Sequence, residues 1–318
     1  MALKNTVCES TMTLDIQKKF DVAVVIPTVL RPTLLRAVRS VYNQDLSGRI
    51  QILIGIDKHL GDANCLDVLL RERPENVCIT TLDLGYSTSI RHGGIYSNQY
   101  SGAIRTILSY AANSRFIAYL DDDDWWGADH LSSLLSAISD KAWAFSYRWF
   151  VDQETEWPIC RDEWDSLGPG RGINLQRFGG FVSPSCLLVN KEVCHSLFPL
   201  WALSAFPDGT GEDRLIFREL LKYKSWVGSE KYSVFYEMRA DVQHHPHHEK
   251  EFSSRKILWI YDRSLIKQII QFLNEAQRSF KDGELKNAQE KCAAILALNP
   301  YHAETLRLLC AIHEAADY

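Results

Sequence analysis

The chain has 318 residues, 46% of them hydrophobic and 24% charged, which is typical of a globular protein with a substantial core and leaves room for two domains. Its 35 basic and 40 acidic side chains sum to a net charge of −5, which argues against nucleic acid as a partner. The sequence shows no apolar run of the ~20 residues that a membrane span needs, no secretory signal and no C-x-x-C pair among eight cysteines. We therefore expect a cytoplasmic protein with reduced cysteines.

Strands and helices alternate in the first third of the chain. The β-branched run at 22–26, closed by Pro27, predicts a strand buried on both faces. Apolar residues at helical spacing between 34 and 42 predict the next helix. A strand at 50–56, a helix at 63–72 and a strand at 77–80 follow. This order predicts right-handed crossovers and a doubly wound, mostly parallel α/β sheet.

Two acidic positions follow predicted strands. After a Gly/Ser-rich stretch at 85–101, a helix is expected at 99–112 and a strand at 115–120. That strand leads directly into the aspartate run, Asp121–Asp124, and Asp57 follows the strand at 50–56 in the same way. Ligands of open α/β sheets bind beyond the carboxyl ends of the strands. We therefore expect Asp57 and the aspartate run to face one cleft.

The pattern loosens beyond residue 141 and becomes purely helical at the end. Strands are expected at 142–151, 185–189 and 231–238, and a helix at 212–221. Helices are expected at 256–280, 284–298 and 301–316, after a polar, His-rich stretch around 240–250. The sequence therefore predicts an N-terminal tail at 1–20, an α/β domain at 21–248 and a helical C-terminal segment at 249–318.

The C-terminal segment resembles a tetratricopeptide repeat. With Ile269 counted as position 1, Ala276, Gly283, Ala288 and Pro300 stand at positions 8, 15, 20 and 32, where small residues allow two helices to approach closely. About one repeat and one further helix are present. Because repeats need neighbours to bury their faces, we expect this segment to pack on the main domain, on a protein partner or on a second copy. A generic helical hairpin is the alternative.

The aspartate run favours a cation site. Two carboxylates 4 Å apart repel by about 4 kcal/mol at an effective dielectric near 20. A divalent cation such as Mg²⁺ or Mn²⁺ would relieve this repulsion and would share its shell with substrate phosphates. In the alternative, the run is an acidic turn that caps the helix beginning near Asp129.

Two further groups of residues allow both a functional and a structural interpretation. Glu212 and Asp213 open an amphipathic helix, where one carboxylate suits a general base, although capping of the helix explains one of them equally well. The histidines at 244–248 surround a proline that interrupts any helix. They indicate a solvated loop, a ligand that completes the catalytic metal's shell, for which His245 is the candidate, or a transition-metal site. Trp157, Trp164 and Trp201 fill the core or stack on an acceptor sugar.

Taken together, these motifs resemble those of the family 2 inverting glycosyltransferases, which have the GT-A fold. The resemblance covers about residues 21–248. Its matching segments, in chain order, are Val24–Thr28, the strand that ends at Asp57, Ala103–Arg105, Leu120–Trp125 and Gly211–Asp213. Arg105 lies 121 − 105 = 16 residues before the aspartate run, as in the family's Arg-bearing helix. Thr106 departs from the family, which usually has Asn there.

The resemblance implies a donor-binding role for the first group of residues. Pro27 and Thr28 would line the nucleotide pocket, and Asp57 would accept a hydrogen bond from the base. Arg105 would approach the base or the diphosphate, and Asp121, with Asp122 beside it, would lie near the ribose.

The resemblance also implies the metal ligand and the base. Asp123 would bind the metal that bridges the diphosphate, and Asp213 would be the general base. Glu212 would help to position the acceptor. A role for His244 or His245 is left open by their distance from the last predicted strand.

The expected function is a metal-dependent inverting glycosyltransferase. It would move a sugar from a nucleoside-diphosphate sugar, UDP-sugar favoured, to a hydroxyl of a glycan, a lipid-linked carrier or a protein, in bacterial surface-polysaccharide synthesis. With a lipid-linked acceptor the protein would work at the inner face of the membrane. One alternative is a nucleotidyltransferase of similar fold, which the glycine-free loop at 27–31 disfavours. The other is a non-catalytic scaffold that acts through the C-terminal helices, which the presence of Asp123 and Asp213 disfavours.

Overall fold

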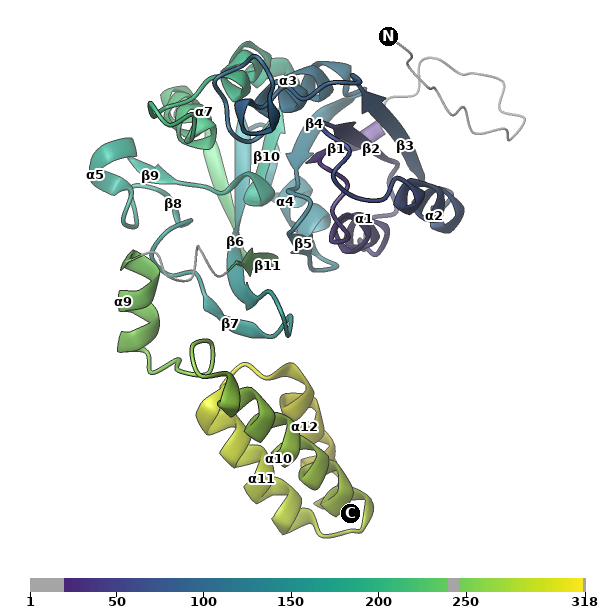
Figure 1. Ribbon diagram of the computed structural model, residues 1–318, viewed down its shortest axis with the longest axis vertical. Helices are drawn as coiled ribbons and strands as arrows, with labels where there is room; N and C mark the ends of the chain where they lie inside the picture. The colour runs from purple at the N-terminus through teal and green to yellow at the C-terminus, as the bar shows by residue number, and fades with distance from the viewer. Residues whose placement is uncertain (1–19, 240–245, 317–318) are drawn as a thin grey trace. The chain divides into compact units, whose positions relative to one another are not determined.

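The computed structural model describes residues 20–239 and 246–316 (Figure 1). Their main feature is a nine-stranded sheet in the order β3-β2-β1-β4-β10-β6-β11-β5, with β7 paired to β6, and β8 and β9 form a separate small sheet. In the described ranges, no helix combines the length and the hydropathy that crossing a membrane requires.

The parallel half of the sheet has two central strands, β1 and β2, that are buried along nearly their whole length, and two strands that are partly buried, β3 and β4. It comprises β1 (Phe20–Thr28), β2 (Ile50–Ile56), β3 (Val77–Asp83) and β4 (Ser114–Tyr119). The strand β1 pairs with β2 up to Thr28, but with β4 only up to Val25. Pro27 therefore lies in β1 beyond its last partner on β4, where its missing N–H is tolerated. The predicted alternation of strands and helices is confirmed.

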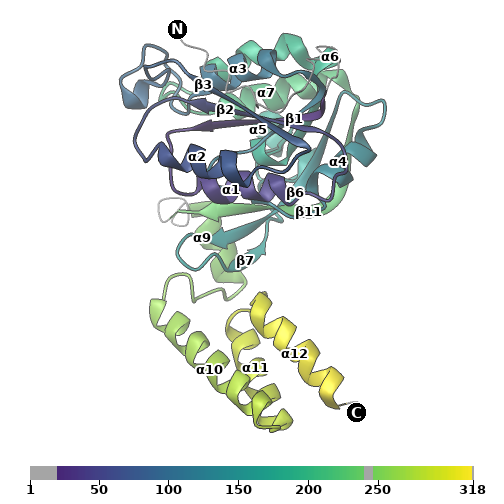
Figure 2. The ribbon, with the colours of Figure 1, turned by 90° about the vertical axis from the view of Figure 1, so that its right-hand side faces the viewer.

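Helices cover both faces of the sheet. The helices α1 (Leu34–Tyr42), α2 (Asn64–Glu72) and α4 (His130–Ile138) lie on one face, and α3 (Gly102–Ala111) and α7 (Glu212–Leu220) on the other (Figures 1 and 2). The helix α3 packs closely on the 3₁₀ segment η3 (His195–Ala202). A Cβ atom at Gly102 would lie 1.7 Å from the carbonyl oxygen of Trp201, so only glycine allows this approach.

The other half of the sheet is antiparallel. It contains β5 (Trp125–Trp126), β6 (Trp143–Asp152), β7 (Pro158–Arg161), β10 (Leu187–Asn190) and β11 (Trp226–Met238). The strand β10 pairs antiparallel with both β4 and β6. The connections carry β8 (Gly168–Pro169), β9 (Gly180–Phe181) and the short helices α5 (Leu175–Phe178) and α6 (Lys191–Cys194). The three strands expected in this region are confirmed.

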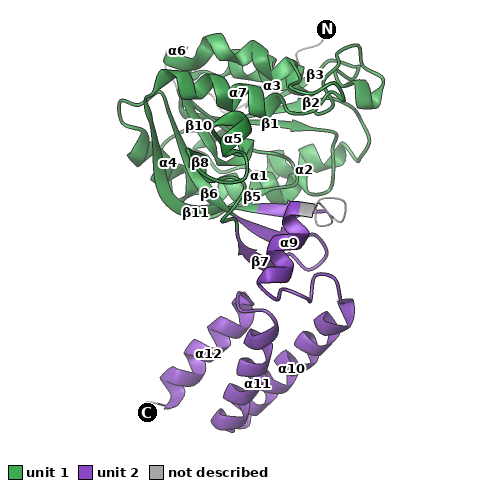
Figure 3. Ribbon diagram, turned by 90° about the vertical axis from the view of Figure 1, so that its left-hand side faces the viewer, with its two compact units in different colours: residues 1–148, 162–235 green, residues 149–161, 236–318 purple. Residues whose placement is uncertain are grey.

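The described residues divide into two compact units (Figure 3). The first contains residues up to 148 together with 162–235, and the second contains 149–161 and the residues from 236 on. The helices of the second unit are α9 (Pro246–Ser254), α10 (Arg263–Lys281), α11 (Leu285–Leu298) and α12 (Ala303–Ala316). Buried Ala276 and Ala288 lie in the core of these helices, and Gly283 turns the chain between α10 and α11 with φ +78°.

Two expectations for the C-terminal helices were wrong. The helix expected from 256 begins at Arg263, because the carboxylate of Asp262 accepts a hydrogen bond from the N–H of Ser264 (3.0 Å) and caps it there. Pro246 does not interrupt a helix but begins α9, since the first turn needs no donor from it. His248 is consequently buried against Phe150 and Phe252 rather than solvated in a loop.

Candidate active site

The loop after β1 contacts the aspartate run beyond the carboxyl ends of the parallel strands. The hydroxyl of Thr28 donates to Asp122 Oδ2 (2.7 Å) and accepts the N–H of Leu30 (2.8 Å). Leu30 has φ +65°, a left-handed conformation that is unfavourable for a branched side chain and typical of functional loops. Two sequence-predicted site residues that are 94 positions apart, Thr28 and Asp122, are thus hydrogen-bonded, and Thr28 also fixes the turn that follows β1.

Two arginines that the sequence analysis missed lie against the run. Arg31 Nη1 donates to Asp122 Oδ1 (3.1 Å) and to Asp123 Oδ2 (2.6 Å). Arg36 donates to the main-chain oxygen of Asp123 (2.8 Å), with its guanidinium 3.9 Å from the ring centre of Trp125. Part of the repulsion that suggested a metal is therefore offset by protein cations. The Arg31-Pro32 pair just after the first strand was the signal in the sequence that could have identified Arg31.

Arg105 joins the aspartate run to the acidic pair that opens α7. Its buried guanidinium donates to Asp121 and, through Nη1, to Glu212 Oε1 (3.4 Å). It lies 5.2 Å from the ring centre of Trp201. Burial opposes the charge of Arg105, but the carboxylates of Asp121 and Glu212 outweigh it and raise the pKa of the guanidinium. Arg105, on the predicted Arg-bearing helix, therefore connects the aspartate run after β4 with the acidic pair at the start of α7.

The last member of the run has a structural role. Asp124 is buried and accepts a hydrogen bond from Ser185 Oγ (2.6 Å), which itself accepts the N–H of Asp121 (3.1 Å). The indole of Trp126 donates to the carbonyl of Ser185 (2.8 Å). Ser185 thus anchors the turn that presents the first three aspartates.

Two carboxyl groups of the site hold their protons unusually tightly. Burial, followed by the charge of Asp213, raises the pKa of Glu212 to about 8, although Arg105 opposes the shift. Burial also raises the pKa of Asp122 to about 6, against the opposing charge of Arg31. Glu212 is therefore uncharged over much of the neutral range, whereas a base must be ionised. Of the pair, Asp213 is the better candidate for the base.

Asp213 is more accessible than Glu212, with a side chain that is 25% exposed. It lies in the first turn of α7, after Gly211, whose φ of +84° begins the helix in a conformation that favours glycine. Its Oδ1 accepts the N–H of Arg214 (2.7 Å), and its Oδ2 accepts Nη1 of the same residue (3.2 Å). Arg214 is a further site residue that the sequence analysis did not single out.

Asp57 ends β2 as expected, but its carboxylate is engaged within the protein. Ser87 Oγ donates to Oδ2 (2.6 Å), and the N–H and hydroxyl of Thr88 donate to Oδ1 (2.7 and 2.6 Å). The side chain is almost fully buried. A carboxylate offers about four acceptor positions, so one remains for a further donor. Asp57 holds the beginning of the loop at 85–101 in place.

The end of the same loop is held by a buried asparagine, Asn98, which the sequence gave no reason to select. Its amide nitrogen donates to the carbonyls of Trp201 (3.2 Å) and Leu203 (3.1 Å). Its amide oxygen accepts the N–H groups of Tyr100 (2.8 Å) and Gly102 (3.1 Å). All four hydrogen-bonding positions of the amide are used, and the start of α3, with Arg105 one turn further on, is thereby fixed.

The protein groups near Asp123 suit a metal only if the substrate shares in binding it. Across 20–239 and 246–316, no cluster of three or more His, Cys, Asp or Glu residues could hold a metal. Mg²⁺ and Mn²⁺ nevertheless bind with one or two carboxylates when substrate phosphates complete the shell. Asp123, 21% exposed, can supply such a ligand. The other predicted ligand, His245, lies outside the described residues.

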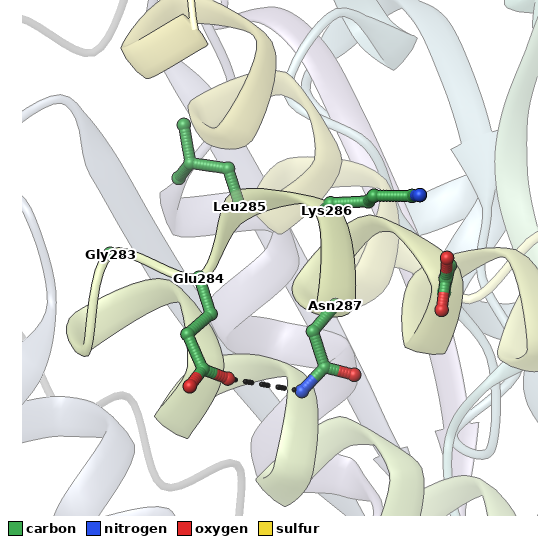
Figure 4. Close-up of a pocket in the computed structure, with 6 residues that line it drawn as sticks. Gly283, Glu284, Leu285, Lys286 and Asn287 are labelled. Atoms are coloured by element: carbon green, nitrogen blue, oxygen red, sulfur yellow. Dashed lines mark hydrogen bonds between the residues drawn. The ribbon is translucent and has the colours of Figure 1, made fainter.

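A shallow cavity of about 650 Å³ lies elsewhere, at the turn between α10 and α11 (Figure 4). Its lining residues belong to this turn and to the first turns of α11, and Asn287 donates to Glu284 across it (3.2 Å). None of the predicted site residues lines it. We therefore do not assign it a catalytic role.

Comparison with known proteins gives matches to solved structures alone, since no family model and no curated protein matches. S. aureus TarS aligns with a TM-score of 0.50 and 13% identity, over 69% of this chain and 37% of that one. Its 1-349 portion in complex with UDP-GlcNAc aligns with 0.49 and 14%, over 69% and 59%. The Pyrobaculum calidifontis mannosyltransferase PcManGT, in complex with GDP-Man and Mn²⁺, aligns with 0.49 and 12%, over 95% and 82%.

These alignments span less than two thirds of the two TarS chains, and their sequence identities are low. The similarity to TarS therefore concerns architecture. It agrees with the parallel order β3-β2-β1-β4 continued by antiparallel strands, with the acidic run at the end of β4. The chain has the fold of the GT-A glycosyltransferases, as the sequence predicted.

Proposed function

We propose that the protein is a metal-dependent inverting glycosyltransferase of the family 2 type, with a nucleoside-diphosphate sugar as donor. The observation that carries this proposal is the position of Arg105. Its guanidinium contacts both Asp121, at the end of β4, and Glu212, which precedes Asp213 in α7. The donor-side aspartates and the candidate base thus belong to one site, as single-step sugar transfer requires.

The nucleotide would bind beyond the ends of β1, β2 and β4. Thr28 and Asp122 lie in one hydrogen-bonded group there, and we assign them to the nucleotide-sugar pocket together with Pro27. Asp121, held by Arg105, would face the ribose. The remaining acceptor position of Asp57 would receive a hydrogen bond from the base, which favours a uracil N–H.

Asp123 would hold the divalent cation, Mn²⁺ or Mg²⁺. Such an ion, shared with the diphosphate, neutralises the negative charge that develops on the leaving group. Arg31 contacts Oδ2 of this carboxylate (2.6 Å) and leaves its other acceptor positions open. Its guanidinium would add a positive charge beside the leaving group.

Asp213 would accept the proton of the acceptor hydroxyl. The hydroxyl oxygen forms a bond to the anomeric carbon while the bond from that carbon to the β-phosphate oxygen breaks. The electron pair of the broken bond leaves with the diphosphate, and the proton passes to the carboxylate. One displacement inverts the anomeric configuration, and a positioned base typically contributes about 10²–10⁴-fold to the rate. Glu212, protonated and buried, would help to shape the acceptor position.

We further propose that the acceptor is a glycan, a lipid-linked carrier or a protein, as in bacterial surface-polysaccharide synthesis on the cytoplasmic side of the membrane. The domain boundary near 248 and the tetratricopeptide-like nature of the C-terminal helices are part of this proposal. The buried small residues Ala276 and Ala288 support the latter. A protein partner, or a second copy of the chain, would dock on these helices.

A thermal-shift panel tests the donor class and the metal together. We expect one nucleoside diphosphate among UDP, GDP and dTDP to raise the melting temperature in the presence of Mn²⁺, because a ligand at 100 times its Kd stabilises the folded state by about 2.7 kcal/mol. The shift should be lost in Asp123→Ala. Asp140→Ala, at an exposed aspartate in the turn after α4, is the matched control.

The products distinguish this function from its alternatives. Incubation of UDP-glucose, UDP-N-acetylglucosamine, GDP-mannose and dTDP-glucose with Mn²⁺ should release the free sugar and the nucleoside diphosphate, with water as the acceptor. Pyrophosphate release from a nucleoside triphosphate and a sugar phosphate would indicate a nucleotidyltransferase instead. Absence of both binding and turnover would contradict any donor role for the site.

A further inference from the structure

Arg214 contacts both oxygens of the candidate base. Its main-chain N–H donates to Asp213 Oδ1 (2.7 Å) and its Nη1 to Oδ2 (3.2 Å). Neighbouring residues of a helix do not face each other, so the side chain of Arg214 must fold back to reach Oδ2. Such a conformation persists only if other contacts hold the guanidinium.

An aromatic ring provides one of these contacts. The guanidinium of Arg214 lies 3.2 Å from the ring centre of Phe181, a residue of β9 that is itself buried. Phe181 packs edge-on against Phe217 of α7, with 6.2 Å between the ring centres. The planar cation therefore rests on a ring that is fixed to the same helix that carries the base.

A buried carboxylate provides the second contact. Asp165 Oδ1 lies 3.9 Å from Nη2 of Arg214 and accepts a hydrogen bond from Asn174 (2.6 Å). Its other oxygen accepts a hydrogen bond from Nη2 of the buried Arg148 (2.6 Å). Asp165 is thus held on both sides and presents a negative charge to Arg214.

The loop that carries Asp165 is itself organised around one carboxylate, that of the fully buried Asp162. Its two oxygens accept the N–H groups of Trp164, Asp165 and Ser166 at 2.8–3.1 Å, and Nε of Arg148 at 2.7 Å. All its acceptor positions are used within the protein. Asp162 thus holds Asp165 in place. Asp165 lies against Arg214, and Arg214 contacts Asp213.

We propose that Arg214 is a positioning residue that fixes the carboxylate of Asp213 for proton transfer, and that Phe181 and Asp165 hold it in place. The inference rests on the proposed function, because it takes Asp213 as the base. The guanidinium occupies one acceptor position of Oδ2 and the main chain one of Oδ1, so one position on each oxygen remains for the acceptor hydroxyl, in an orientation that Arg214 fixes.

The test compares Arg214→Ala and Arg214→Lys with Arg218→Ala, an exposed arginine one turn further along α7. Each variant is assayed in the presence of Mn²⁺ for hydrolysis of whichever nucleotide sugar the wild type turns over. Since a misplacement of about 1 Å costs about 10²-fold in rate, we expect kcat of Arg214→Ala to fall by about 30–100-fold with KM for the donor unchanged. Arg214→Lys should recover part of the loss, and Arg218→Ala should match the wild type.

Chemical rescue separates positioning from folding. Guanidinium chloride at a low, non-denaturing concentration should restore part of the kcat of Arg214→Ala, while sodium chloride at equal ionic strength should not. Asp165→Asn, which keeps the shape but removes the charge behind Arg214, should lower kcat by a smaller factor. Circular dichroism melting of each variant shows whether it is folded.

Equal kcat for Arg214→Ala and the wild type would overturn the inference while leaving the proposed function intact. A parallel loss of donor affinity and kcat without rescue by guanidinium would also overturn it, because that pattern indicates a structural role. If the wild type turns over none of the nucleotide sugars, the proposed function fails, and the inference fails with it.

Discussion

The aspartate run and the acidic pair both consist of carboxyl side chains, but they differ in their partners and in their burial. In the run, Asp121 contacts Arg105, Asp122 contacts Thr28 and Arg31, and Asp124 contacts Ser185. These partners come from different elements of the fold. In the pair, burial leaves Glu212 protonated up to a pKa of about 8, while Asp213 stays partly exposed.

The difference shows how a protein holds several carboxylates in one place. Separate partners hold the members of the run in place, which suits the binding of a polyanionic ligand through a cation. In the pair, burial favours the neutral form of Glu212 beside the more exposed Asp213, which suits proton transfer. Arg105 contacts both groups through its guanidinium. Substitutions in either group test this division.

Asp213→Asn should abolish the base while keeping the shape of the site. We expect kcat for nucleotide-sugar hydrolysis or transfer to fall by about 10²–10⁴-fold, because a positioned base contributes about that much. The donor-induced thermal shift should remain. Asp208→Asn, at an exposed aspartate just before α7, is the matched control and should keep full activity. A rate within threefold of the wild type would remove Asp213 from the mechanism.

Arg105→Met should remove the link between the two groups. It leaves Asp121 without its cation and Glu212 without a hydrogen-bond donor, and breaking a buried ion pair in this way costs about 3–5 kcal/mol of unfolding free energy. Chemical denaturation measures the loss. Arg115→Met, at an exposed residue of β4, should change stability by no more than about 0.5 kcal/mol. Equal stability of the two variants would show that the link carries no energy.

Glu212→Gln should show, through the pH dependence of stability, that Glu212 is the protonated member of the acidic pair. The folded protein keeps the proton of Glu212 up to a pKa of about 8, whereas the unfolded chain loses it near the ordinary value of about 4.3. The wild type therefore loses stability as pH rises through this window, by at most about 1.4 kcal/mol per pH unit, and glutamine does not. We expect the variant to match the wild type near pH 5 and to melt at a higher temperature at pH 8.5.

The control for this experiment is Glu75→Gln, at an exposed glutamate. Its melting temperature should follow that of the wild type at both pH values. A constant difference between Glu212→Gln and the wild type across the range would mean that Glu212 is charged in the folded protein.

Ser185→Ala should loosen the run while leaving the acidic pair at the start of α7 unchanged. The change removes a hydrogen bond to the buried Asp124 and the acceptor of the Asp121 N–H. A buried group that loses one partner costs about 1 kcal/mol or somewhat more. We expect this decrease in unfolding free energy and a smaller effect on kcat than in Asp213→Asn. Ser253→Ala, at an exposed serine of α9, should leave the stability unchanged.

The parallel half of the sheet could be predicted from sequence because burial determines its composition. Residues 22–26 and, apart from Gln51, residues 50–56 are apolar on both faces. This pattern is expected of a strand that is covered on both sides. The same reasoning placed the aspartate run at a strand end. It also placed Glu212 and Asp213 in the first turn of a helix, since apolar spacing from Leu215 on defined that helix.

The partners of these residues could not be predicted, because local patterns do not encode contacts between distant segments. Thr28 meets Asp122 across 94 positions, and Arg105 meets Glu212 across 107. The structural role of Asp124 depends on Ser185, which the sequence placed only at the start of the strand expected at 185–189. Pro246 was misjudged for a different reason, since proline interrupts a helix in its interior but favours the first turn.

Two buried residues, Asp57 and Asn98, hold the two ends of the loop that follows β3. Asp57 fixes Ser87 and Thr88 at its entrance, and Asn98 fixes its exit together with the start of α3. The stretch between them, 90–97, contains Ile90, Ile95 and Tyr96 with large exposed fractions. Because both ends of the segment are held, we expect substitutions of these exposed residues to leave Arg105 where it is.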